Sequence, residues 1–569
     1  MQNLSPGPAA LLGNGSLLAT FSERGLVERL FWPSLDCGSH LGELRFSIEA
    51  GGAVEQSYLQ DANVLLTRAD GAEFVDLVHE LEPVLLRRIT ANGHDGNLIV
   101  DCRPELDGAK GGLAASVDGN RVVFYRRNIA LAVGAVGAEA FSTGLGKTEG
   151  GISVPFQRDA VVALAFGSSS REAVARLDAA LQQDFNALVT SRRRHDAAVL
   201  SSAQPPVATA DVGALYRRTL LVLDLLADRS SGAVIAAPEL DPEFEHSGGY
   251  GFVWGRDLAF IVLALLAAGR RELAIRALRW CQRAQEPEGL WLQRHWTDGS
   301  LAPSWCRHQL DETGAILFAY QAAWRELRDT GLDRELWPSA RRAAEFLLTT
   351  IEDDGIPTAT ADLWEEREGR HAFTAAAVSA GLLAAAAFAS RHEPDRADPY
   401  RLAAEVIREG IERELWSDWH GRYLRSIGDP TLDVSLLGLA WPFAAVDTGG
   451  ERIRATVASL ESELGSPGGG VVRYAGDTYA GGNKWVLAAL WLGLWHRHVG
   501  EHAGLERSLD YAHRAQTDLG LLPEQVTEDG EPAWVVPLAW SHAMLVLAAR
   551  PELELIRAKE PAAAQLAWP

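Results

Sequence analysis

The chain has 569 residues, of which 47% are hydrophobic and 18 are tryptophan. This length exceeds what one hydrophobic core usually serves, so we expect two domains of unequal size. The formal net charge of -23 argues against nucleic acid or a membrane surface as a partner, because both are themselves anionic. A small neutral ligand suits this surface better.

The N-terminus and the cysteines predict a cytoplasmic location. MQNLSPGPAALLGNGSL lacks the basic start and apolar run of a signal peptide, and we expect no segment to sustain the roughly 18 apolar residues of a membrane span. The four cysteines lie far apart without metal-ligand spacing, as suits thiols in a reducing compartment. We expect no metal and no cofactor, although the sequence does not decide whether a structural calcium ion binds.

From about residue 15 to residue 170 the chain has the pattern of β-strands. Alternating or β-branched runs, separated by Gly, Asn and Asp, are clearest in GELRFSIEA, AEFVDLVHE, GNLIVDCRP, NRVVFYRRN and DAVVALAFG. Such a succession of strands predicts a large antiparallel β-sandwich, which we assign to residues 1–180.

Helical periodicity replaces the strand pattern after residue 170. SSREAVARLDAALQQDFNALVTSRRRHDAAVL is followed by SSAQPPVATA, whose two prolines break the pattern. We assign residues 181–205 to a linker helix and a domain boundary, residues 206–555 to the second domain and residues 556–569 to a C-terminal tail. The overall acidity argues against a phosphate-binding role for the basic SRRRH run.

About twelve apolar helical segments follow residue 205. Short connections follow the even-numbered segments, and long connections rich in Gly, Trp and charge follow the odd-numbered ones. Helix pairs whose long loops all lie at one end close into a ring, which predicts an (α/α)6 barrel with one elaborated face. Binding residues are expected there, because loops on a rigid scaffold carry function. The segments centre near residues 219, 262, 278, 319, 343, 381, 406, 440, 456, 491, 510 and 544.

A pair of glutamates before the sixth segment is the most informative motif. In ATADLWEEREGRHAFT, Glu365 and Glu366 follow Trp364. A carboxyl group held against an aromatic wall loses water, so its pKa rises and it can act as a general acid near neutral pH. Adjacent glutamates at a helix start more often only complement the helix dipole. Their place on the elaborated face favours the chemistry of glycosidic bond cleavage.

The other long loops carry side chains suited to a sugar. Pyranose rings stack on aromatic faces, and their hydroxyls need charged or amide groups in fixed geometry. A single Trp near a helix start is more often a core residue, but packing does not explain why so many lie in alternate loops. The loops supply Trp254, Trp296, Trp305, Trp364, Trp485, Trp534 and Trp540 with Arg256, Asp257, Arg307 and Asp311.

Arg256 and Asp257 open the second segment. They could form a surface salt bridge worth less than about 1 kcal/mol. We favour a buried pair that binds two neighbouring sugar hydroxyls, because Tyr250 and Trp254 flank it in a Gly-rich approach.

Hydrolysis of an acetal needs a second carboxylate, which either attacks the anomeric carbon or deprotonates a water that does so. Glu524 in LLPEQV is the candidate, because its loop lies across the closed ring from Glu365. Glu528 and Glu531 compete with it, but they lie in the polar TEDGEP turn, where a solvated role fits better.

Several ordered motifs carry a resemblance to a known family. YGFVWGRD, SLAPSWCRHQLDE, DLWEE, GGNKW, and PEQV followed by PLAWSHA resemble glycoside hydrolase family 15, the glucoamylase family, in its bacterial and archaeal branch. The resemblance spans nearly the whole chain and includes GNGSLLATFSERGLVERLFWPS, which looks like that branch's β-sandwich. It implies that Glu365 is the general acid and Glu524 the general base. Family members invert anomeric configuration, so the two carboxyl groups should lie about 6.5–9.5 Å apart.

The resemblance also implies substrate-binding positions. Glu366 would help to hold the sugar, and Trp305 with Arg307 matches the wall around the scissile bond. Trp364 and Trp485 complete the expected set. The residues that match the grip on the non-reducing-end glucose are Tyr250, Trp254, Arg256 and Asp257.

Two positions depart from the family pattern. Gly255 stands where the family commonly has Pro, which loosens the loop without removing a functional group. Lys484 stands between Asn483 and Trp485 where the family commonly has Pro. A cation there could contact the acceptor side of the substrate or an anion, although a solvated lysine on a loop rim is more common.

These features predict an inverting, exo-acting hydrolase that releases glucose from the non-reducing end of malto- or isomalto-oligosaccharides. A trehalase with the same carboxylates is the alternative. A sugar phosphorylase would need an anion site in place of the base, for which Lys484 is a weak hint, and a non-catalytic sugar-binding protein would not need both carboxylates. Exposed sandwich faces are compatible with a homo-oligomer, which the sequence does not decide.

Overall fold

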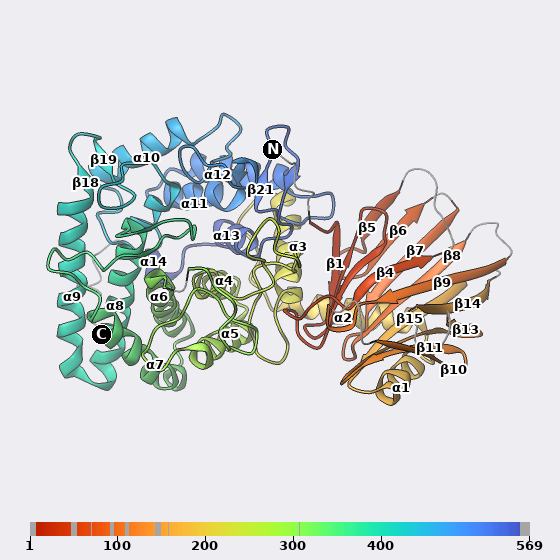
Figure 1. The fold of residues 1–569 in the computed structure, drawn as a ribbon. Helices are drawn as coiled ribbons and strands as arrows, with labels where there is room; N and C mark the ends of the chain where they lie inside the picture. The colour runs from red at the N-terminus through yellow and green to blue at the C-terminus, as the bar shows by residue number, and fades with distance from the viewer. Residues whose placement is uncertain are drawn as a thin grey trace.

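The computed structural model describes residues 7–46, 54–69, 71–91, 96–108, 113–142, 149–156, 159–306 and 308–557. Figure 1 shows two bodies side by side, one of antiparallel sheets and one of helices. The predicted combination of a β-sandwich and an (α/α)6 barrel is confirmed. We continue to propose domain boundaries at residues 180 and 205.

Two large antiparallel sheets face each other in the N-terminal body of the described chain. The larger sheet has the order β10 (Ala114–Asp118), β11 (Arg121–Arg126), β12 (Ile129–Ala135), β15 (Asp159–Gly167), β8 (Val84–Ala91), β7 (Ala72–Val78), β6 (Leu65–Ala69) and β5 (Glu55–Tyr58). The smaller sheet has the order β13 (Glu139–Ser142), β14 (Gly150–Phe156), β9 (Gly96–Pro104) and β4 (Leu41–Phe46).

Burial along the strands follows the sequence pattern. In β9, Leu98, Val100 and Cys102 alternate inward into the core between the sheets. In β15 both faces are buried, because one side faces that core and the other is covered by α1 (Ser170–Leu181). This double covering explains why DAVVALAFG is a continuous apolar run rather than an alternating one.

A small sheet and a helix join the two bodies. The sheet contains β1 (Ala10–Gly13), β2 (Leu18–Phe21) and β3 (Val27–Phe31), and its apolar residues belong partly to the sandwich core and partly to the barrel core. The helix is α2 (Phe185–Ser201), which contains the SRRRH run. Its Arg192 forms a buried ion pair with Asp196 and donates to the carbonyl of Gly13 at 3.1 Å. Arg192 of the basic run therefore ties this helix to the small sheet.

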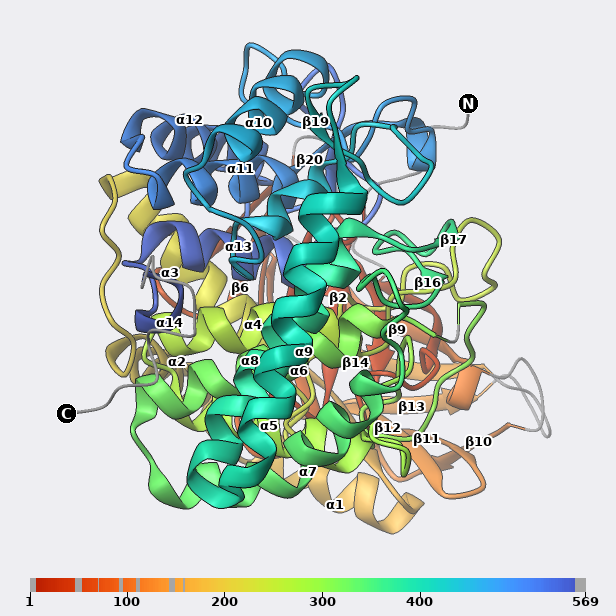
Figure 2. The same cartoon turned by 90° about the vertical axis from the view of Figure 1, so that its left-hand side faces the viewer.

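The helical body is a double ring of helices (Figure 1), and Figure 2 shows the same body turned by 90°. Within the described residues, neighbouring inner segments contact one another around the whole ring, and the last contacts the first. The inner segments are α4 (Gly255–Ala267), α6 (Leu310–Leu327), α8 (Ala372–His392), the 3-10 segment η4 (Val434–Leu439), α11 (Val486–His498) and α13 (Ala539–Ala549). The outer helices are α3 (Ala210–Leu225), α5 (Arg271–Ala284), α7 (Thr330–Leu348), α9 (Ala397–Gly410), α10 (Glu451–Glu463) and α12 (His502–Ala515), and the short α14 (Glu554–Arg557) ends the described chain.

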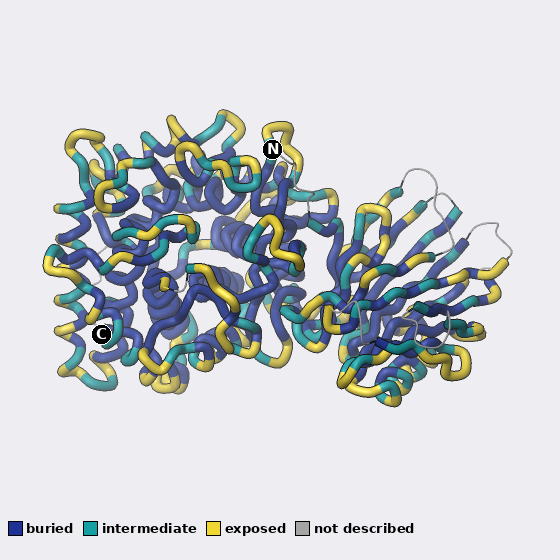
Figure 3. Tube along the Cα trace, viewed as in Figure 1, coloured by how far each residue is buried: buried dark blue, intermediate teal, exposed yellow. Residues whose placement is uncertain are grey.

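The two rings differ in how their helices are buried. Every residue of α4 is buried, whereas α5 buries only one stripe. Figure 3 shows the inner segments as the buried centre of the barrel. Helices that are apolar all round must pack inside, and amphipathic helices cover them. The even-numbered predicted segments are the inner ones, so the long loops all precede an inner segment.

Two expectations from the sequence are wrong in detail. The segment near residue 440 is a six-residue 3-10 helix followed by turns rather than an α-helix, because Pro442 has no N–H and its ring blocks the preceding turn. The helix α8 does sustain an apolar stretch of membrane-spanning length, but 94% of that stretch is buried inside the barrel. It is a core helix of the inner ring.

Candidate active site

The loops that precede the inner segments gather at one end of the barrel and enclose a cavity of about 230 Å³. The first turns of α4, α11 and α13 also contribute lining residues. The lining residues are Ala236, Ser247, Gly248, Gly249, Tyr250, Trp254, Arg256, Asp257, Trp305, Leu363, Trp364, Glu365, Glu366, Arg473, Tyr479, Trp485, Leu487, Glu524, Leu538 and Trp540.

The structure brings the predicted site residues together. All of them that lie in the described chain line this cavity, and Arg307 lies outside the described residues. Trp540, one of the loop aromatics noted from the sequence, also lines it, whereas Trp296 packs against Phe252 behind it. Trp534 contributes indirectly, by donating its indole N–H to the hydroxyl of Tyr479 at 3.0 Å.

Glu365 is a buried carboxyl group with neutral donors on both oxygens. The Trp254 indole N–H donates to Oε1 at 2.5 Å, and the Gln293 amide donates to Oε2. Burial raises the pKa of Glu365 to about 7, and the charge of Arg256, 3.7 Å from Oε1, opposes that rise. A carboxyl with this pKa holds its proton for much of the time at neutral pH, as a general acid must.

The backbone of Glu365 is unusual. Its φ is 65°, a left-handed conformation that costs free energy for a residue other than glycine and persists only where its surroundings hold it. Asp362 holds this turn: its carbonyl accepts from the Glu365 N–H at 3.0 Å, and its Oδ1 accepts from the Glu366 N–H at 2.8 Å. The turn sends the two adjacent glutamates in different directions, which gives them different partners.

Glu524 is the second buried carboxyl group of the cavity. Its Oε1 accepts from the hydroxyl of Tyr250 at 2.8 Å, and its Oε2 accepts from the amide of Gln525 at 3.1 Å. The Tyr250 hydroxyl lies 2.7 Å from that of Tyr479. Because the Tyr250 hydroxyl donates its only proton to Glu524, it must accept from Tyr479, whose oxygen accepts from Trp534. The hydroxyl protons therefore order into a chain that ends on Glu524. Burial raises the pKa of Glu524 to about 7, while the Tyr250 hydrogen bond and the charge of Arg473 lower it.

Arg256 stands at the start of α4 among four carboxyl groups. It is 4% exposed, and it lies 3.2 Å from Asp311, 3.2 Å from Glu312 and 3.4 Å from Asp257 in addition to its contact with Glu365. Burial raises the pKa of Asp257 to about 6. The surface salt bridge considered from the sequence is thus a buried cluster. Among the described residues, Arg256 Nε has no hydrogen-bond partner, and Asp257 Oδ2 has only its ion pair with Arg256. Both groups therefore have hydrogen-bonding capacity left for a ligand hydroxyl.

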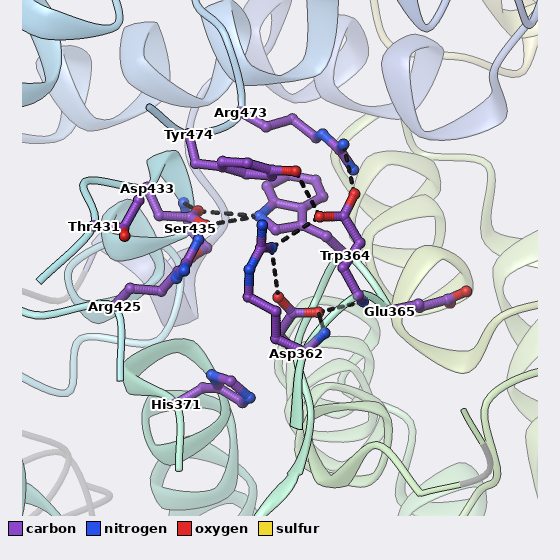
Figure 4. A network of polar contacts seen from close by, with 12 residues as sticks. Asp362, Trp364, Glu365, His371, Arg425, Thr431, Asp433, Ser435, Arg473 and Tyr474 are labelled. Atoms are coloured by element: carbon purple, nitrogen blue, oxygen red, sulfur yellow. Dashed lines mark hydrogen bonds and ion pairs between the residues drawn. The ribbon is translucent and has the colours of Figure 1, made fainter. Parts of the chain in front are cut away.

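Glu366 belongs to a separate polar network, shown in Figure 4. Its Oε1 accepts from Arg473 at 2.8 Å and its Oε2 accepts from the hydroxyl of Tyr474 at 2.5 Å. The neighbouring Trp364 indole donates to both oxygens of Asp433 at 3.0 and 3.1 Å. The side chain of Glu365 points away from this network (Figure 4). This arrangement suits a binding role for Glu366 rather than proton transfer.

Arg473 is the main site residue that the sequence interpretation missed. Its guanidinium lies within 4.8–5.2 Å of the ring centroids of four aromatic residues, and Asp477 holds it with two hydrogen bonds of 2.8 Å. Tyr479, in the same loop, was missed as well. The signal was available, since both lie in VVRYAGDTYA just before the GGNKW motif.

Lys484 does not line the cavity in the described chain. It lies on the short strand β20 (Lys484–Trp485), where successive side chains point to opposite faces. Trp485 faces the cavity, whereas a Cβ on Gly470 would lie 2.7 Å from the Lys484 side chain. The cation is therefore on the far side of the strand from the cavity.

Burial is graded across the cavity. Arg256, Leu487, Leu538 and Trp540 are almost fully buried, whereas the indole of Trp305 is 52% exposed. This gradient places Trp305 at the mouth and the arginine cluster at the closed end.

Comparisons with known proteins find glycosyl hydrolases. Residues 278–507 match the sequence pattern of glycosyl hydrolases family 15. The chain is 31% identical over 350 residues to an uncharacterized glycosyl hydrolase of Methanocaldococcus jannaschii, an alignment that covers 58% of this chain and 55% of that protein. It is 32% identical over 234 residues to an isomaltose glucohydrolase of Kribbella flavida, covering 38% of this chain and 58% of that protein.

A solved structure of a bacterial glucoamylase complexed with acarbose superposes with a TM-score of 0.81 at 19% identity and covers 98% of this chain and 96% of that one. That similarity shows a shared fold of sandwich and barrel. The chain spans little more than half the length of the two curated relatives described above. The chain is therefore similar to the glycosyl hydrolases of family 15 over residues 278–507, and it shares the fold of the solved bacterial glucoamylase.

Proposed function

We propose that this protein is an inverting exo-acting α-glucoside hydrolase that releases glucose from the non-reducing end of α-gluco-oligosaccharides. The observation that carries the proposal is a pair of carboxyl groups in one aromatic cavity that is closed at one end: Glu524 is 2% exposed and the side chain of Glu365 is 11% exposed. The names of relatives, which include isomaltose glucohydrolase and glucoamylase, support glucose as the sugar released.

In the proposed mechanism, Glu365 is the general acid. Its carboxyl proton passes to the glycosidic oxygen while the bond from that oxygen to the anomeric carbon breaks. The carboxylate that remains is stabilised by the Trp254 and Gln293 donors and by the charge of Arg256. These contacts lower the pKa of Glu365 in the resting protein, and for the same reason they stabilise the Glu365 carboxylate that forms when the proton is transferred.

Glu524 is the proposed general base. It takes a proton from a water whose oxygen bonds to the anomeric carbon from the opposite side. The Tyr250 hydroxyl holds one carboxylate oxygen by donating to it, which leaves the other lone pairs for the water. A pKa near 7 makes this carboxylate a stronger base than a solvated glutamate.

The binding residues divide between the two sides of the scissile bond. Arg256 and Asp257 at the closed end would bind hydroxyls of the terminal sugar, and Glu366 with Arg473 would bind the same sugar from the other side. Trp305 at the mouth would stack against the next sugar, because its exposed indole face is of the kind that pyranose rings pack on.

A substrate panel tests the proposal. We expect release of glucose from one or more of maltose, isomaltose, kojibiose, nigerose, trehalose and soluble starch, with β-glucose as the first anomer seen by NMR. Added phosphate should not change the rate, since a hydrolase uses water. First release of α-glucose would contradict inversion, and a strict requirement for phosphate would indicate a phosphorylase instead.

A further inference from the structure

The amide of Gln293 contacts Glu365 from outside the cavity lining. Gln293 is fully buried and is absent from the cavity lining in the described chain. It lies in the loop between α5 and α6, and its Nε2 donates to Oε2 of Glu365. A buried amide placed there acts on the reaction through the groups that it contacts, of which the Glu365 carboxyl lines the cavity.

The orientation of this amide is fixed from its other end. Gln293 Oε1 accepts from the backbone N–H of Cys306 at 3.4 Å and from the hydroxyl of Ser304. A backbone N–H can only donate, so the oxygen of the amide must face Cys306 and the nitrogen must face Glu365. The backbone N–H of Cys306 thus determines that the amide presents its N–H donor to the Glu365 carboxyl.

Residues 304–306 contact both Gln293 and the backbone of Glu365, so these hydrogen bonds form a closed circuit. The carbonyl of Glu365 accepts from the thiol of Cys306 at 3.2 Å and from the indole N–H of Trp305 at 3.3 Å. The same short segment therefore touches Glu365 twice, once at its backbone and once through the Gln293 amide. Trp305, which forms the mouth of the cavity, belongs to this circuit.

We propose that Gln293 is a positioning residue that orients the Glu365 carboxyl toward the leaving group and ties it to the Trp305 segment. This inference rests on the proposed function of Glu365. A donor to Oε2 stabilises the ionised carboxyl group, so it eases proton release during bond cleavage and restrains rotation of the side chain. The structural alternative is that Gln293 only satisfies buried groups and contributes to folding.

The test uses Gln293→Met, which keeps the length of the side chain and removes the donor. Loss of the donor should raise the pKa of Glu365 by about half to one unit. The ratio of variant to wild-type rate should therefore increase from acid to alkaline pH by about three- to tenfold, because more Glu365 stays protonated in alkali. A ratio that is flat with pH, together with a lower Tm, would refute a positioning role.

Leaving-group dependence gives a second readout. Turnover of a disaccharide, whose sugar leaving group needs a proton, should fall about tenfold or more, whereas turnover of α-glucosyl fluoride should change less than about twofold, since fluoride leaves without one. Equal losses on both substrates would contradict the proposal. Gln309→Met is the matched control, because Gln309 is equally buried and donates to the carbonyl of Asp362 without contacting the Glu365 carboxyl.

Two additions keep the result interpretable. Gln293→Glu replaces Gln293→Met if that variant fails to fold. It preserves the acceptor for Ser304 and Cys306 and places a second carboxyl group beside Glu365, so it should raise the pKa of Glu365 further than Gln293→Met does. A ¹³C carboxyl titration of the substrate-free protein, with the Glu365 signal assigned by its loss in Glu365→Gln, measures that pKa without activity. A shifted titration in a protein that hydrolyses none of the sugars would support the contact and refute the proposed function.

Discussion

The hydroxyl of Tyr250 controls the charge of Glu524 in the proposed mechanism, and Tyr250→Phe removes it. The hydroxyl donates to Glu524 Oε1 at 2.8 Å inside a buried site. Hydrogen bonds to charged groups contribute about 1.5–3 kcal/mol, and about 1.4 kcal/mol corresponds to one pKa unit. The donor stabilises the ionised form, so its removal should raise the pKa of Glu524 from about 7 by about one to two units.

The consequence is a loss of rate that is largest in acid, extends through neutral pH and disappears in alkali. Glu524 must be ionised to act as a base, so the ionised fraction at pH 6 should fall about ten- to a hundredfold in the variant. Well above the pKa of both carboxyl groups the variant should approach the wild-type rate, since Glu524 is then ionised in both. Initial rates of glucose release between pH 4 and pH 10, divided by the wild-type values, measure this directly.

Tyr479→Phe is the matched control for Tyr250→Phe. Its hydroxyl contacts Tyr250 at 2.7 Å and does not contact Glu524. It should change the rate ratio far less with pH. A flat ratio for Tyr250→Phe, or an equal slope in both variants, would refute the assignment of Glu524 as the base that Tyr250 controls.

Three further changes test other parts of the structure. Glu524→Gln should retain sugar binding by calorimetry while turnover falls by several orders of magnitude; unchanged turnover would remove Glu524 from the mechanism. Gly248→Ala places a Cβ 1.9 Å from the Trp305 ring, so it should raise KM for disaccharides with little change in Tm; an unchanged KM would show that the mouth of the cavity does not bind the second sugar. Gly314→Ala places a Cβ 2.3 Å from a backbone oxygen of α8, so it should cost about 1–3 kcal/mol of unfolding free energy. The same change at Gly213, where the nearest atom is 3.8 Å away, should be neutral or stabilising by up to about 1 kcal/mol. Equal stability of these two glycine variants in urea denaturation would contradict the close helix packing.

Much of the fold could be predicted from the sequence, because hydrophobic periodicity is a local property. Period-two runs marked the strands, and helical runs separated by alternating short and long connections marked a ring of hairpins. The prediction was wrong near residue 440, where Pro442 reduces an inner α-helix to a six-residue 3-10 segment. It was wrong again for α8, whose apolar length resembles a membrane span until the ring that surrounds it is known.

The sequence also determined which loops meet and which residue types the cavity contains. Closure of the ring sends all long loops to one face, so Glu365 and Glu524 had to share it. The sequence did not show that the adjacent Glu365 and Glu366 have different environments. The φ of 65° at Glu365, which Asp362 holds, sends the adjacent glutamates to partners that are distant in sequence, such as Gln293 and Arg473.

Only the tertiary structure decided how the carboxyl groups are tuned. Burial raises the pKa of both Glu365 and Glu524 to about 7, and burial is a property of the whole assembly. The donors that oppose this rise come from loops tens to hundreds of residues away, namely Gln293 for Glu365 and Tyr250 for Glu524. Periodicity and motifs identify the chemical groups of a site, whereas their protonation depends on distances and solvent exclusion that exist only after the chain has folded.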